Sequence, residues 1–326
     1  MKSSHGGVTS VELFKGLQQT ALSSKACGTV VNYTSSLNRW VKFANTNKLV
    51  VFPVSVVDAA LFFSHLATSQ VSASVIESSY CALKWAHDFA GVPNPMSSTF
   101  VKNMVEGAKR QNAKPTSKKS PISKEALTAC CIKHEHSDEM PIRRDISMAL
   151  LLFAGFFRFS ELANLTIGDI SIIDTHLTIK VSHSKTDQYR KGNEVVISRS
   201  GKVTCPVSNL ERYMKLADIS TSKVSDFLFK PIVKVRSRYK VIDKVKPLSY
   251  TRARESLVKL LREFVPNTAN ISLHSFRSGG ATTAANAQVL DRCWKRHGRW
   301  RSETAKDGYV EDSLDNRLLV TKSLGI

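Results

Sequence analysis

Three short segments in the second half of the chain hold side chains suited to phosphate chemistry. His274 and Arg277 lie three positions apart in LHSFRSGG, so they would share one face of a helix. Arg158 directly follows an apolar stretch in GFFRFSEL, where a charge is costly unless it meets a ligand or a partner such as Glu161. Tyr309 lies in KDGYV. Taken singly, each has an ordinary explanation as a helix entrance, a helix ion pair or a packing residue.

Together, these residue types match the needs of phosphodiester cleavage. The non-bridging oxygens gain charge in the transition state, and the planar, permanently charged fork of arginine suits them. A nucleophile must attack phosphorus, and a general acid must protonate the leaving oxygen. HSKTDQYRKG places Lys185 at a turn between two predicted strands, with Lys191 on the same predicted hairpin. In isolation, either is an ordinary surface lysine.

The charge balance indicates a polyanionic partner. Among 326 residues, 47 Lys and Arg oppose 27 Asp and Glu, which gives a net charge of +20. Such an excess most often marks a nucleic-acid-binding protein, although a ribosomal or membrane-surface protein could show it too. The excess is shared: 13 basic and 5 acidic residues precede position 122, and 34 and 22 follow. Two basic halves predict a clamp rather than one basic tail.

Neither a membrane segment nor a metal site is expected. No run reaches the ~18 apolar residues that span a bilayer, and MKSSHGGVTS lacks the apolar core of a secretory signal. The six scattered cysteines are typical of reduced thiols in a soluble intracellular protein. CCIKHEH at 130–136 gathers two cysteines and two histidines, but adjacent cysteines do not match common zinc spacing.

The sequence predicts a mainly α fold with one small antiparallel β-sheet, an α+β class. Amphipathic periodicity indicates helices over most of the first ~110 residues, with Trp40, Phe62 and Trp85 in the core. NAKPTSKKSP (112–121), with two prolines and three lysines, predicts a linker. Beyond it, we expect buried helices, about three strands between 165 and 198, and helices again from 251 to the end.

The spacing after Arg277 completes a recognisable pattern. Twenty-two residues separate Arg277 from Trp300, and eight separate Trp300 from Tyr309. In order and spacing, the chain resembles the tyrosine recombinase (phage integrase) family, whose pattern is Arg with a following acidic residue, Lys on a hairpin, His-x-x-Arg, His or Trp, and Tyr nine positions later. Within the family, HSFRSGGATTAAN and KRHGRWRSETAKDGYVEDS are similar to the crypton and DIRS-like recombinases of eukaryotic mobile elements.

The resemblance implies a site and a reaction. The catalytic residues would be Arg158, Lys185, His274, Arg277, Trp300 and Tyr309, supported by Glu161. Tyr309 would form a 3′-phosphotyrosyl link, the arginines would hold the phosphate, and Lys185 would protonate the leaving 5′-oxygen, without metal, ATP or cofactor. Trp300 stands where the family often has a second histidine, but an indole N–H can also donate to phosphate. His297 lies at the wrong distance from Tyr309 to take this place.

The resemblance also implies domains and partners. Residues 1–111 would form a helical, SAM-like core-binding domain, 112–121 a basic linker, and 122–326 the catalytic domain. Double-stranded DNA would be the substrate, bound by a homodimer or homotetramer whose 313–326 helix docks on a neighbour rather than on its own core. We expect nuclear localisation in a eukaryotic host, and otherwise a cytoplasmic protein on DNA. Candidate DNA-binding residues are Arg39, Lys42, Lys109, Arg110, Lys118 and Lys119.

Two other functions fit the same residues. A type IB topoisomerase-like enzyme would share the chemistry but not the site specificity. A domesticated DNA-binding protein would keep the fold without the reaction, although it would have no need for Tyr309.

Overall fold

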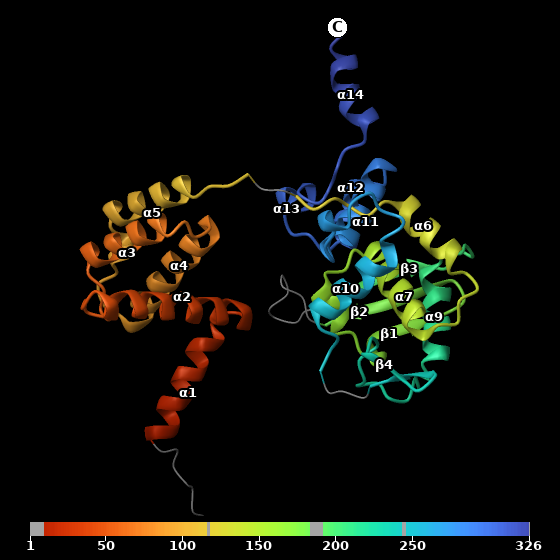
Figure 1. The fold of residues 1–326 in the computed structure, drawn as a ribbon, viewed down its shortest axis with the longest axis horizontal. Coiled ribbons are helices and arrows are strands. Elements are labelled where there is room, and N and C mark those ends of the chain that lie inside the picture. Colours follow the sequence, from red (N-terminus) through yellow and green to blue (C-terminus); the bar gives the residue numbers. More distant parts are fainter. Residues whose placement is uncertain (1–9, 116–117, 183–191, 243–245, 326) are drawn as a thin grey trace, which may run out of the picture. The chain divides into compact units, whose positions relative to one another are not determined.

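The computed structural model describes residues 10–115, 118–182, 192–242 and 246–325. The chain divides into two compact units, Met1–Ser117 and Lys118–Ile326, each with its own apolar core (Figure 1). The division falls inside the 112–121 segment that composition indicates as a linker. Among the described helices, none combines the length and apolar character needed to cross a membrane.

The first unit is helical in its described part. Its helices are α1 (Ser10–Ser23), α2 (Cys27–Thr46), α3 (Val56–Thr68), α4 (Ala73–Ala90) and α5 (Thr99–Gln111), with a 3₁₀ turn at Pro95–Ser97. The apolar stripes of α2 to α5 meet in one core, where Trp40 and Phe62 are buried as predicted. Trp85 differs from the prediction, because it is only half-buried and stacks on Phe89 at a centroid distance of 5.7 Å.

The second unit is built around one buried helix, α7 (Met140–Ala154). All of its residues from Arg143 to Leu152 are buried, because α9, α10 and α11 pack against it. The other helices are α6 (Lys124–Lys133), α8 (Phe159–Ala163), α9 (Pro206–Leu216), α10 (Tyr250–Leu261), α11 (His274–Asn286), α12 (Asp291–His297), α13 (Glu303–Asp307) and α14 (Leu314–Ser323).

A three-stranded antiparallel sheet completes this unit and confirms the predicted fold class. Its order is β1 (Ile170–Ile172), β2 (His176–Val181) and β3 (Asn193–Ser198). Alternate residues of the strands, such as Leu177, Ile179, Val195 and Ile197, are buried in the core, as the period of two requires. Lys185 and Lys191 belong to the segment between β2 and β3 and lie outside the described residues.

Two elements of the second unit were not predicted. One is α9, which begins with Pro206 and buries Val207, Leu210 and Tyr213 on one face. The other is a second sheet of two strands, β4 (Ile232–Val235) and β5 (Arg238–Val241). Its strands have four residues each and none of these is buried, so their sequences carry little of the apolar pattern that marks a strand.

Two glycines bring α11 close to its neighbours. A Cβ atom at Gly279 would clash with the carbonyl oxygen of Ile122, and one at Gly280 with that of Phe153 at the end of α7. The two glycines of LHSFRSGG therefore permit a close approach between α11 and neighbouring backbone. It sets the first turn of α11, with His274 and Arg277, beside the chain that leaves α7.

Candidate active site

The site begins where the chain turns after α7. Phe156 adopts a left-handed backbone conformation (φ 47°), and Arg158 follows as the residue that caps the short helix α8. The Arg158 backbone N–H donates to Glu161 Oε2 at 3.0 Å, and its Nη1 donates to Oε1 at 2.7 Å. Glu161 is therefore the partner that the sequence predicted for Arg158.

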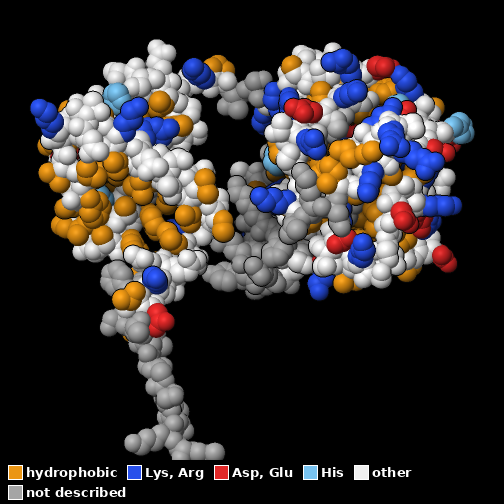
Figure 2. Space-filling view, turned by 60° about the horizontal axis from the view of Figure 1, so that its bottom comes forward, with side chains coloured by type: hydrophobic (Ala, Val, Ile, Leu, Met, Phe, Trp, Pro, Cys, Tyr) orange, Lys and Arg blue, Asp and Glu red, His pale blue; other side chains and the backbone are white. Residues whose placement is uncertain are grey.

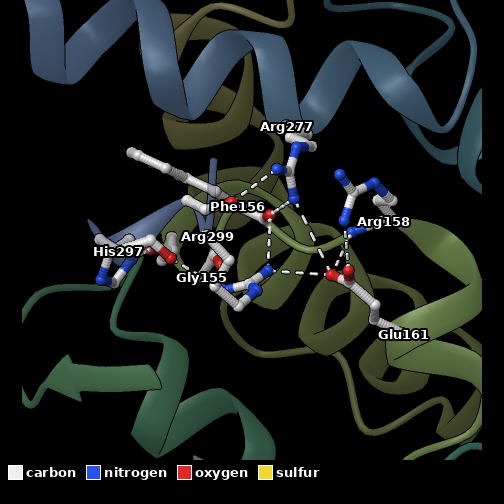
Figure 3. Close-up of polar contacts among 9 residues, drawn as sticks. Gly155, Phe156, Arg158, Glu161, Arg277, His297 and Arg299 are labelled. Carbon is white, nitrogen blue, oxygen red and sulfur yellow. Dashed lines mark hydrogen bonds and ion pairs between the residues drawn. The ribbon is translucent and has the colours of Figure 1, made fainter. Parts of the chain in front are cut away.

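Glu161 is the centre of a group of three arginines. Its carboxylate is buried, with only 2% of the residue exposed, and it also accepts a hydrogen bond from Arg299 Nη2 at 2.9 Å. Arg277 Nη1 lies 3.8 Å from the same Oε2 atom (Figure 3). Burial raises the pKa of Glu161, but Arg299, the Arg158 amide and side chain, and Arg277 outweigh it, so the pKa lies below its ordinary value.

Arg277 is completely buried in the first turn of α11. Its Nη2 donates to the Gly298 carbonyl at 2.6 Å, and its Nη1 donates to the Phe156 carbonyl (Figure 3). The guanidinium carbon lies 4.6 Å from the centroid of the Trp300 ring and 5.0 Å from that of Tyr309. Burial, followed by the nearby charge of Arg158, lowers the pKa of Arg277 to about 10.

Tyr309 lies just after α13, among aromatic neighbours. Its ring centroid is 5.4 Å from that of Trp300 and 5.9 Å from that of His274. The backbone is held by a hydrogen bond from Thr282 Oγ1 to the Tyr309 carbonyl (3.4 Å), and by one from the Tyr309 N–H to Lys306 (3.0 Å). The half-buried tyrosine is therefore placed against its own chain's arginine and histidine.

Lys306 anchors the helix that precedes Tyr309. Its buried ammonium pairs with Asp291 of α12 and with Glu303 of α13, and it lies 4.7 Å from the centroid of the Trp294 ring. α13 is thereby tied to α12, and the position of Tyr309 depends on both helices.

Trp300 is a buried hydrogen-bond donor beside this cluster. Only 6% of the residue is exposed, and its Nε1 atom has no acceptor in the part of the chain that the structure describes. Unpaired buried donors are rare in folded proteins and costly. Such an N–H is suited to donate a hydrogen bond to a phosphate oxygen.

A cleft of about 750 Å³ opens on these residues. Its polar lining includes Arg158, His274 and Tyr309, and its remaining walls come from Phe159, Ser160, Ala163, Asn164, Pro247, Leu248 and Tyr250. A cation, an imidazole and a phenol thus face one space, as phosphate cleavage requires. Arg277 and Trp300 lie behind Tyr309 and do not line the cleft.

Arg299 is the site residue that the sequence did not reveal. It adds a third guanidinium to Glu161, yet nothing in the motif pattern singles out the arginine of HGRW. His297, which the spacing to Tyr309 excluded as a ligand, is half-buried and bonded through Nε2 to the Ala154 carbonyl at 2.7 Å. Burial lowers the pKa of His297.

The predicted DNA-binding residues of the first unit differ in their exposure and in their ion pairs. Arg39 and Lys42 are exposed and line a groove of about 670 Å³ with residues of α2 and α3. Arg110 is also exposed. Lys109, in contrast, pairs with Glu77 at 2.9 Å and Glu106 at 2.8 Å, so its charge is largely offset within the unit.

Two further candidates, Lys118 and Lys119, are exposed at the start of the second unit. Lys119 Nζ donates to the Ala269 carbonyl at 2.7 Å, which ties this segment to the unit.

The described residues contain no group of three or more His, Cys, Asp or Glu that could hold a metal ion. Cys130 and Cys131 are buried in α6, and burial raises the pKa of their thiols to about 12 and about 11. Neutral, buried thiols of this kind are packing residues rather than ligands.

Space-filling views show mixed surfaces on the described residues. Apolar side chains gather on the visible face of the first unit, while Lys and Arg side chains are scattered over the visible face of the second (Figure 2). The basic charge is therefore not confined to one short segment of the second unit.

Known proteins share both sequence and fold with the chain. No family model matches it. The chain is 25% identical over 300 residues to an integrase/recombinase described as a xerD homologue from Selenomonas ruminantium, across 88% of this chain and 82% of the relative. Its fold is similar to that of XerH site-specific recombinase in a post-cleavage complex with palindromic difH substrate. The TM-score is 0.61, with 15% identity over 97% of this chain and 85% of that one.

A second solved structure agrees. A lambda integrase dimer bound to a COC′ core site has a TM-score of 0.55, with 16% identity over 93% of this chain and 95% of that one. The chain therefore has the tyrosine recombinase fold, and the resemblance indicated by the motifs from Arg158 to Tyr309 is confirmed. The narrower likeness to crypton and DIRS-like recombinases stays a prediction.

Proposed function

We propose that the chain is a site-specific DNA recombinase that cuts and rejoins strands through a phosphotyrosyl intermediate on Tyr309. The observation that carries the proposal is the arrangement of one cleft, in which Tyr309, His274 and Arg158 face the same space. The net charge of +20 supports a polyanionic substrate. The solved neighbours named above are both bound to DNA.

The cleavage step follows from these side chains. The Tyr309 hydroxyl attacks phosphorus and forms a 3′-phosphotyrosyl bond, while the bond to the 5′-oxygen breaks. Since a phenol ordinarily loses its proton near pH 10, His274, whose ring centroid lies 5.9 Å from that of Tyr309, assists proton removal in this proposal. Lys185 stays the predicted acid for the leaving 5′-oxygen. Religation reverses these steps, and the covalent link retains the bond energy, so no ATP is consumed.

Arg158 and Arg277 stabilise the charge on the phosphate in this proposal, but they start from different positions. Arg158 lines the cleft, whereas Arg277 is buried behind the Tyr309 ring. A movement of Tyr309 toward phosphorus uncovers Arg277 and, beside it, the unpaired N–H of Trp300. Both donors then become available as the negative charge develops.

The C-terminal helix supports an assembly of several copies on DNA. None of the residues of α14 is buried, although it carries Leu314, Leu318, Leu319 and Val320. A helix that exposes four large apolar side chains is suited to dock on a neighbouring copy. Deletion of residues 313–326 should abolish multimerisation on DNA without removing DNA binding, measured by native gel shift and light scattering. Unchanged assembly after the deletion would contradict this part of the proposal.

Two assays on the full chain test the reaction. Wild-type protein should relax a supercoiled plasmid without ATP and should form an SDS-resistant protein–DNA adduct. Tyr309→Phe should bind DNA equally well and form no adduct. Tyr250→Phe, which changes a second tyrosine in the same cleft, should still form it. If Tyr250→Phe lost the adduct and Tyr309→Phe kept it, the nucleophile would be misassigned.

A failed reaction would point to the non-catalytic alternative. DNA binding by the wild type with no adduct, even on nicked substrates carrying candidate element ends, would refute the recombinase proposal. Relaxation of any plasmid, without preference for a site, would instead favour the topoisomerase-like activity.

A further inference from the structure

Arg299 occupies a backbone position that suits glycine. Its φ is 59°, in the left-handed region where a side chain is strained, and only 7% of the residue is exposed. A buried charge on a strained backbone persists only where its contacts compensate for both costs. The contacts of Arg299 therefore indicate its purpose.

The guanidinium of Arg299 joins two parts of the site. Nη1 donates to the carbonyls of His297 (2.8 Å) and Gly155 (3.2 Å), and Nη2 donates to the Phe156 carbonyl at 3.0 Å and to Glu161 at 2.9 Å (Figure 3). These bonds link the turn that precedes Arg158 to the turn that precedes Trp300.

Arg299 and Arg277 share one hydrogen-bond acceptor and lie close to the same carboxylate oxygen. The Phe156 carbonyl accepts from both guanidinium groups, and both approach Glu161 Oε2, Arg299 at 2.9 Å and Arg277 at 3.8 Å. Arg158 takes the other carboxylate oxygen at 2.7 Å. Because Arg299 makes the shorter contact with Oε2, Glu161 neutralises the charge of Arg277 less than it would if Arg299 were absent.

The charges of the cluster support the same conclusion. Glu161 has a lowered pKa and is ionised at neutral pH, so one negative and three positive charges leave a net charge of +2. Without Arg299 the net charge would be +1. A phosphodiester attacked by a phenolate carries two negative charges in total, which the cluster with Arg299 matches.

We propose that Arg299 is a positioning residue that offsets the charge of Glu161, so that Arg158 and Arg277 keep theirs for the phosphate. This inference rests on the proposed function. Arg299 does not line the cleft, so it acts through its neighbours rather than on the DNA. A purely structural role for Arg299 is the competing explanation.

A second substitution that restores the charge of the cluster separates the two explanations. Arg299→Gly removes the guanidinium without backbone strain and should slow adduct formation about 10- to 100-fold, the loss known for residues that orient the ligands of a metal ion. Glu161→Gln added to Arg299→Gly restores the net charge of +2 and should recover at least about tenfold of that loss. A double variant as slow as, or slower than, Arg299→Gly would overturn the proposal, because lost structural contacts would only accumulate.

Two control variants sharpen the comparison. Arg299→Lys keeps the charge but not the fork, so it should be faster than Arg299→Gly. Arg143→Met removes another buried arginine, which donates to the carbonyls of His134, Glu135 and Ser137 away from the cleft. It should lower the melting temperature but leave adduct formation unchanged below that temperature. A slowed reaction in the folded Arg143→Met protein would indicate a general structural effect.

A second measurement decides the proposal even if the wild type forms no adduct. Inorganic phosphate should raise the melting temperature of wild type more than that of Arg299→Gly, and the double variant should regain the wild-type increase. An equal increase in all three proteins would overturn the role of Arg299, whatever the adduct assay shows. Failure of the recombinase proposal is seen separately, as a lack of adduct from wild type.

Discussion

Removal of the Glu161 carboxylate tests the buried cluster most directly. In Glu161→Ala, three guanidinium groups lose the carboxylate that Arg158 and Arg299 contact at 2.7 and 2.9 Å and that Arg277 approaches at 3.8 Å. Two of these arginines are almost fully buried, so water replaces the lost contacts poorly. Breaking a buried ion pair by removing one partner costs about 3–5 kcal/mol of folding free energy.

This free energy converts into a large change in melting temperature. For a folding unit the size of residues 118–326, each kcal/mol lowers the melting temperature by about 2–4 °C, so the decrease should be about 6–20 °C. Differential scanning calorimetry of the full chain measures it, because the two units have separate cores and can melt separately. The transition of the first unit is an internal reference that should not move.

A matched surface variant isolates the effect of burial. Glu263→Ala also removes a carboxylate from a basic partner, Lys133, but both side chains are exposed. It should leave the transition of the second unit close to that of wild type, because water screens such a pair. If Glu161→Ala moved the transition no further than Glu263→Ala, the cluster would not hold its arginines as the structure indicates.

Three further outcomes are expected. Folding lowers the pKa of Glu161, so its ionised carboxylate stabilises the fold above its ordinary pKa, and this stabilisation is lost as the pH falls through the folded pKa. In calorimetry from pH 7 to 3, the melting temperature should therefore fall less steeply with pH in Glu161→Gln than in wild type. Gly280→Ala forces a methyl group against the Phe153 carbonyl and should destabilise the second unit by about 1–3 kcal/mol, whereas Gly107→Ala, in open space on α5, should stabilise the first by about 0.5–1 kcal/mol in urea titrations. Lys42→Ala should lower the slope of log affinity for DNA against log salt concentration by about one phosphate contact. Lys109→Ala should leave this slope unchanged, since its charge is already paired. Equal slopes in the two variants would contradict this distinction.

Much of the local structure could be predicted from the sequence, because its causes are local. Apolar residues at helical spacing predicted α2 to α5, and alternation predicted the sheet of β1 to β3. Of the elements that were missed, α9 packs against the distant helix α7, whereas β4 and β5 pair with each other and bury none of their residues. Trp85 shows the same limit, since an apolar stripe indicates a buried face but not how completely its edge is covered.

For the site, the sequence by itself determined the residue types and their order. The motifs from Arg158 to Tyr309 indicated a phosphate-cleaving site, and the spacing of His274 and Arg277 on one helical turn placed both on α11. Charge composition indicated a polyanionic partner, because the net charge depends on which residues are present and not on how the chain folds.

Only the tertiary structure decided how these charges are balanced. Glu161 and Arg299 are 138 positions apart, and they meet where Gly280 lets α11 approach the end of α7 and where the chain turns sharply at Phe156 and Arg299. The electrostatic interaction of two groups depends on their separation in space and on their burial, neither of which a linear pattern contains. The burial of Arg277 behind Tyr309 is a consequence of the same packing.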